Sequence, residues 1–149
     1  MLIKGIEHNV VNDAPFIGAL IIAPRCLKGC PGCQNDHLKQ EPDIEVTSDE
    51  IIEEVKSNFF NEGIILGGLE WTHSPKELRE LVGKALSSNL EVMLYTYRTE
   101  ENFKDVFPDL YSLPIWVKFG EYDKNKTVKG NIHYGITLAT SNQYIKKLG

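Results

Sequence analysis

The apolar run Gly18-Ala-Leu-Ile-Ile-Ala23 is the stretch of sequence that decides the fold. It has the length of one strand and offers no polar side chain to either face, which is typical of a strand buried within a parallel sheet. Three further segments also predict strands: a second short buried strand at Ile64–Leu66, a third at Leu90–Tyr97 and a fourth at Ile115–Phe119.

Helical patterns separate these segments. Thr47 and Glu50 predict a capping box at the start of one helix, and its apolar stripe comprises Ile51, Ile52, Val55 and Phe59. Pro75 predicts the start of a second helix, with a capping box formed by Ser74 and Glu77. Its apolar stripe comprises Leu78, Leu81, Val82, Ala85 and Leu86. A short helix is expected from Thr99 to Val106, before Pro108. The polar stretch 121–130 is expected to be a loop, and the tail 132–149 gives no clear pattern.

Strands that alternate with helices on short connections indicate an α/β fold with mostly parallel strands. Such folds carry their functional groups at the carboxyl ends of the strands. The segment after Ala23, the pair Gly67-Gly68, the end of the third strand near Tyr95, and Lys118 are therefore expected to meet at one rim.

Composition narrows the class of protein. The chain has 149 residues, of which 42% are hydrophobic and 25% charged, so we expect one globular domain over residues 1–149. A net charge of −5 argues against a sequence-independent nucleic-acid binder. The longest apolar run is far shorter than the ~20 residues that span a bilayer. We expect a cytoplasmic protein without membrane or direct nucleic-acid partners.

The three cysteines lie within eight residues, at Cys26, Cys30 and Cys33. Loops this short do not support a disulfide framework, whereas clustered thiolates are ligands that iron and zinc prefer. Iron–sulfur clusters of the ferredoxin type use four cysteines; with three, one iron is left for another ligand. A zinc site with His37 as fourth ligand is the alternative.

The cysteine spacing is that of the radical S-adenosylmethionine superfamily. Within it, Cys30-Pro-Gly-Cys-Gln-Asn35 resembles the C-P-G-C-x-N motif of the activating proteins of anaerobic (class III) ribonucleotide reductase. Three other stretches are similar to the glycine-rich strand end, the Y-T-G-Y strand end and the S-N-Q tail of that family: Gly67-Gly-Leu-Glu70, Tyr95-Thr-Tyr97 and Ser141-Asn-Gln143. The similarity extends from about Asn12 to Gln143.

This resemblance implies a compact, incomplete radical-SAM β/α barrel, because a full barrel needs ~250 residues. It implies that Cys26, Cys30 and Cys33 are the catalytic ligands of a [4Fe–4S] cluster, whose remaining iron binds S-adenosylmethionine. One electron then cleaves S-adenosylmethionine, and the 5′-deoxyadenosyl radical takes a hydrogen atom from a glycine of the reductase. The implied partners are the glycyl radical subunit of the reductase, a flavodoxin-like electron donor and a second copy of the chain.

The resemblance also implies contacts to S-adenosylmethionine, at Gly32, Gln34, Gly67, Gly68, Glu70, Tyr95 and Lys118. For Tyr95 the alternative is simple packing, and for Lys118 it is a surface lysine whose stem lies on apolar residues. We expect Gly68→Val to weaken ligand binding more than folding. The chain departs from the family pattern at Ala14, Gln34, Leu69 and Tyr97.

Two other functions remain open from the sequence. One is a different glycyl-radical activase or a small radical S-adenosylmethionine enzyme that acts on a free metabolite. The other is an interaction module that binds zinc through the three cysteines and His37.

Overall fold

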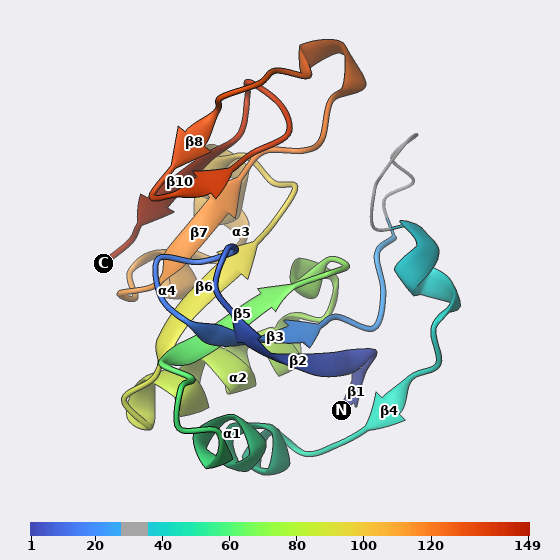
Figure 1. Cartoon of the computed structure of the whole chain (residues 1–149), viewed down its shortest axis with the longest axis vertical. Helices are drawn as coiled ribbons and strands as arrows, with labels where there is room; N and C mark the ends of the chain where they lie inside the picture. Colours follow the sequence, from blue (N-terminus) through green and yellow to red (C-terminus); the bar gives the residue numbers. More distant parts are fainter. Residues whose placement is uncertain (28–35) are drawn as a thin grey trace.

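The computed structural model describes residues 1–27 and 36–149 (Figure 1). In chain order its elements are β1 (Leu2–Ile3), β2 (Gly5–Val10), β3 (Gly18–Ile22), the 3₁₀ helix η1 (Asp36–Gln40), β4 (Ile44–Glu45), α1 (Ser48–Ser57), β5 (Gly63–Gly67), η2 (Trp71–His73), α2 (Pro75–Ser87), β6 (Glu91–Tyr95), α3 (Glu100–Val106), α4 (Pro108–Tyr111), β7 (Trp116–Phe119), η3 (Lys124–Lys126), β8 (Ile132–His133), β9 (Ile136–Thr137) and β10 (Tyr144–Lys147).

A six-stranded sheet in the order β10-β7-β6-β5-β3-β2 forms the centre of the fold. The four inner strands β3, β5, β6 and β7 are parallel, and the edge strands β2 and β10 are antiparallel to their neighbours. The predicted α/β class with mostly parallel strands is therefore confirmed. Two small pairs, β1 with β4 and β8 with β9, lie outside this sheet.

The two faces of the sheet bury different residues because side chains alternate along each strand. Ile64, Leu66 and Val92 belong to the larger core, which also contains the buried apolar residues of α1, α2, α3 and α4. Ile65 and Met93 point to the opposite face. Ile145 of β10 lies on the same face, and the face is covered by Ala14, Phe16, Ile136 and Leu138 from segments outside the sheet.

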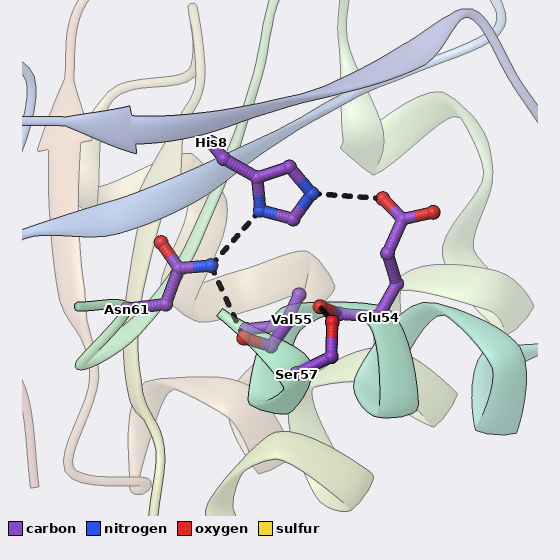
Figure 2. A network of polar contacts seen from close by, with 5 residues as sticks. All are labelled: His8, Glu54, Val55, Ser57 and Asn61. Atoms are coloured by element: carbon purple, nitrogen blue, oxygen red, sulfur yellow. Dashed lines mark hydrogen bonds and ion pairs between the residues drawn. The ribbon is translucent and has the colours of Figure 1, made fainter. Parts of the chain in front are cut away.

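The edge strand β2 is tied to the end of α1 by polar contacts of His8. Figure 2 shows the His8 ring between Glu54 and Asn61. Its Nε2 lies 3.0 Å from Oε2 of Glu54, and its Nδ1 lies 3.0 Å from Nδ2 of Asn61. Asn61 also donates to the carbonyl of Val55 at 3.1 Å. Because the Asn61 amide donates to Nδ1, the neutral His8 ring carries its proton on Nε2 and donates it to Glu54.

The opposite edge strand, β10, is held by the carboxylate of Glu100 at the start of α3. Tyr144 and Lys146 of β10 donate to this carboxylate at 2.7 and 2.6 Å, and Tyr111 of α4 donates to it as well. Burial of Glu100 opposes ionisation, but these hydrogen bonds dominate and lower its pKa to about 2.

Most predicted elements are confirmed, but the structure also contains elements that were not predicted, among them the edge strand β2. Three further differences concern a helix end, a helix start and the tail. The helix predicted to carry Phe59 ends at Ser57, and Phe59 is 91% exposed beyond it. The box predicted at Ser74 and Glu77 does not form: Ser74 makes no capping bond, and its buried hydroxyl has no partner among the described residues. The tail contributes β10 to the central sheet, where the sequence predicted no element.

Within residues 1–27 and 36–149, no helix combines the length and the apolar character that crossing a membrane requires.

The unpartnered Ser74 hydroxyl leads to a stability prediction. Ser74→Ala should change the free energy of unfolding by less than about 0.5 kcal/mol, because no capping bond is lost. Thr47→Ala is the matched control, since both bonds of its capping box are present, and it should cost about 1 kcal/mol. Urea denaturation measures both variants, and equal losses would contradict the structure.

Glu100 should make stability depend on pH in the acidic range. Its pKa is about 2 in the folded state against an ordinary value of 4.5, so its contribution is present above pH 4.5 and is lost as the pH falls toward 2. The Glu100→Gln variant should therefore be less stable than the parent at pH 7, with a difference that shrinks between pH 4.5 and 2. A difference independent of pH in urea titrations would disprove the assignment.

Candidate functional site

The carboxyl ends of the parallel strands are joined by backbone hydrogen bonds that continue beyond the strands. Ala23 donates to the carbonyl of Gly67 at 3.0 Å, and Thr96 donates to that of Lys118 at 3.1 Å. Beyond these bonds, the Glu70 amide donates to the backbone carbonyl of Arg25 at 3.0 Å. The loops that follow β3, β5, β6 and β7 are therefore held side by side before any side chain contributes.

A cavity of about 240 Å³ lies among these loops. Five of the residues predicted for the site line it: Cys26, Gly68, Glu70, Tyr95 and Lys118. The predicted convergence of these segments at one rim is thus confirmed. Gly67 is buried within β5 and is not among the lining residues. The other predicted residues lie outside the described part of the chain, and they are Cys30, Gly32, Cys33 and Gln34.

Gly68 turns the chain from β5 into the cavity wall. Its φ of +81° lies in the left-handed region, and a Cβ there would stand 2.6 Å from Cγ2 of Ile22. Any side chain at this position is strained without a ligand. We therefore expect Gly68→Val to lower folding stability even without a ligand, and a larger effect on binding than on folding stays a prediction. Leu69, the residue inserted relative to the family pattern, is buried in the larger core.

The carboxylate of Glu70 is buried and already accepts hydrogen bonds from the protein. Only 5% of the residue is exposed. Its Oε2 accepts from the amide and the hydroxyl of Thr72, at 3.2 and 2.7 Å. Its Oε1 accepts from the amide of Tyr97 at 2.9 Å. Glu70 therefore links the start of η2 to the end of β6 while it lines the cavity.

Lys118 and Tyr95 line the cavity from neighbouring strands. Lys118 is 8% exposed and donates to the carbonyl of Gly120 at 2.8 Å, so it is not a surface lysine. Tyr95 donates its hydroxyl to the carbonyl of Asp13 at 2.6 Å. Burial, and then the nearby charge of Asp13, raise the pKa of Tyr95. Burial also raises the pKa of Asp13. Tyr95 thus serves as a protonated donor at neutral pH.

His73 ties the cysteine segment to the end of β6. The amide of Leu27, next to Cys26, donates to Nδ1 of His73 at 3.0 Å. Nε2 lies 3.2 Å from the hydroxyl of Tyr97. Because Nδ1 accepts, the neutral ring carries its proton on Nε2 and donates to Tyr97. This role could not be predicted from the sequence, since the four histidines show no common spacing.

The far wall of the cavity comes from the tail, which the sequence left unassigned. Ile136, Leu138 and Gln143 line it. Gln143 is 7% exposed, accepts from the amide of Thr140 at 3.2 Å and donates to the carbonyl of Gly120 at 3.3 Å. The S-N-Q motif pointed to Gln143, but nothing local in the sequence indicated its contacts.

The cavity therefore combines a thiol, a buried ammonium, a buried carboxylate and an apolar wall. These groups suit a small ligand that carries both charges of an amino acid together with an apolar or aromatic part. Within residues 1–27 and 36–149, no group of three or more His, Cys, Asp or Glu side chains is arranged to hold a metal ion. Cys26 is the described member of the expected ligand set, and it packs against the larger core.

No protein-family model, curated protein or solved structure matches this chain. Its function has to be inferred from its own residues and geometry.

The two adjacent glycines offer a direct test of the backbone geometry at the site. Gly68→Ala should lower the free energy of unfolding by about 1–2 kcal/mol, because φ is positive and Ile22 has to move. Gly67→Ala is the control: its Cβ would meet neighbouring side chains at 3.4 Å or more, so it should cost under about 1 kcal/mol. Chemical denaturation measures both, and a larger loss for Gly67→Ala would contradict the geometry.

Proposed function

We propose that this chain is a radical S-adenosylmethionine activase that generates a glycyl radical on an anaerobic ribonucleotide reductase. The observation that carries the proposal is the position of Cys26. This first cysteine of the C-x₃-C-x₂-C motif shares one cavity with the buried Lys118 ammonium and the buried Glu70 carboxylate. The cavity lies at the carboxyl ends of parallel strands, where α/β proteins bind ligands.

The residues present fit an iron–sulfur cluster. Cys26, Cys30 and Cys33 would hold it through thiolates, which are the ligands that such clusters use. Three thiolates leave one iron for the amino and carboxylate groups of S-adenosylmethionine. When bound, the cluster supplies the electron that splits the sulfonium carbon–sulfur bond. Orientation of the ligand and exclusion of water are left to the protein.

The charged side chains of the cavity would each bind a different group of the ligand. Lys118 would donate to the carboxylate of the ligand, and Glu70 would accept a hydrogen bond from its amino group through Oε1. Both groups of the ligand can make these bonds while they are bound to iron. Gly68, which has no side chain, allows the backbone to approach the ligand closely. Ile136 and Leu138 would exclude water from the apolar side of the cavity.

The architecture fits the same proposal. We infer that the six-stranded sheet is an incomplete radical-SAM barrel, with α1, α2, α3 and α4 on its outer face. An incomplete barrel leaves room for a segment of a partner protein beside the cavity. The partners we propose are the glycyl radical subunit of the reductase, a flavodoxin-like electron donor and a second copy of this chain, and the compartment is the cytoplasm.

Anaerobic reconstitution with iron and sulfide tests the proposal. We expect about four iron and four sulfide per chain, and 5′-deoxyadenosine when S-adenosylmethionine and dithionite are added. Cys30→Ala should abolish both. His37→Ala is the matched control, because His37 is exposed on η1 and should leave the iron content and product unchanged.

The alternative functions give different results in the same experiment. One zinc per chain that is lost in His37→Ala, without iron uptake, would identify a Cys₃His zinc module and overturn the proposal. Formation of 5′-deoxyadenosine without a glycyl radical on the reductase would point to another glycyl-radical activase or to a small enzyme acting on a metabolite.

A further inference from the structure

The Glu70 carboxylate is held by a series of hydrogen-bonded side chains, in which Glu70 is bonded to Thr72 and Thr72 to Arg98. The Thr72 hydroxyl lies 2.7 Å from Glu70 Oε2 and 2.9 Å from Nε of Arg98. An arginine Nε can only donate, so the Thr72 hydroxyl accepts from Arg98 and donates its own proton to Glu70. The direction of every bond in this series is thereby fixed.

Arg98 is itself held in place from several sides. It donates to Oδ1 of Asn102 in α3 at 2.8 Å. Its guanidinium carbon lies 5.3 Å from the centre of the Tyr97 ring and 5.8 Å from that of Phe107. A guanidinium stacked on two rings and bonded at both ends has little rotational freedom. Arg98 thus holds the Thr72 hydroxyl in a fixed position relative to α3.

The number of hydrogen bonds that each oxygen of Glu70 already accepts indicates which oxygen is left to bind a ligand. A carboxylate offers about four acceptor positions, two on each oxygen. Oε2 uses both of its positions on the amide and hydroxyl of Thr72. Oε1 uses one on the Tyr97 amide. When the bonds from residues 1–27 and 36–149 are counted, the remaining acceptor position is therefore on Oε1, in a residue that lines the cavity.

We propose that Thr72 and Arg98 are positioning residues that fix the Glu70 carboxylate so that Oε1 accepts a hydrogen bond from the amino group of the ligand. This inference rests on the proposed function, since it takes the ligand to be S-adenosylmethionine. The two residues act only through Glu70 and do not touch the ligand themselves. They therefore set the preference for a ligand with an α-amino group, and contribute nothing to the recognition of its other parts.

Two ligands separate this role from a general contribution to stability. The dissociation constants of S-adenosylmethionine and of its analogue without the α-amino group are measured by anaerobic equilibrium dialysis on the reconstituted chain. Thr72→Val removes the hydroxyl at nearly constant shape, and Thr72→Ser is the matched control that keeps it. Arg98→Met is a second variant that retains the packing on Tyr97 and Phe107 while it removes Nε.

Thr72→Val should raise the dissociation constant of S-adenosylmethionine about tenfold, as expected when a bond to a charged group is lost. The constant of the analogue should change by less than about twofold. Arg98→Met should act in the same direction, and Thr72→Ser should match the parent. In the metal-free chain, Thr72→Val should also speed hydrogen exchange at the Tyr97 amide, which bonds to Oε1.

Equal losses for the two ligands would show a structural role and overturn the inference, as would unchanged binding of both. These results leave the proposed function standing, because the parent chain still binds S-adenosylmethionine. Failure of the parent to bind S-adenosylmethionine would overturn the proposed function and this inference together.

Discussion

The whole site depends on backbone pairing that continues past the ends of four parallel strands. The amides of Ala23, Glu70, Thr96 and Gly120 each bond to a carbonyl on a neighbouring segment. This pairing satisfies buried polar groups that loops otherwise expose to water, and it keeps four loops in register. The Glu70 carboxylate extends it by accepting an amide from the end of β6. Side chains from distant parts of the sequence consequently line one cavity, and the backbone pairing holds these segments together.

The sequence predicted the interior of this fold better than its edges. β3 and β5 were found because strands buried on both faces are uniformly apolar, and α1 because its capping box is local. The edge strand β10 was missed because its pattern is weak and its position depends on pairing with β7. Phe59 was placed on a helix because it continues the apolar spacing, although the chain leaves α1 at Ser57. Periodicity does not reveal where a helix ends.

The sequence predicted those residues of the site that belong to a recognisable motif. Cys26, Gly68 and Glu70 were identified by a spacing or a glycine pair, and they line one cavity. Thr72 and Arg98 were not identified, because their role is a contact between side chains on different elements. Such contacts leave no periodic signal. What the geometry adds is the distribution of charge: a buried cation and a buried anion in the cavity where the first cysteine lies.

The central claim is that this cavity serves to make a radical on another protein. Electron paramagnetic resonance tests it most directly, on the reconstituted chain mixed anaerobically with a class III reductase, S-adenosylmethionine and dithionite. The account predicts a glycyl doublet that requires all four components and vanishes when Cys33 is replaced by alanine. A chain that holds its cluster, binds S-adenosylmethionine and yields no doublet on the reductase of its own organism would contradict it.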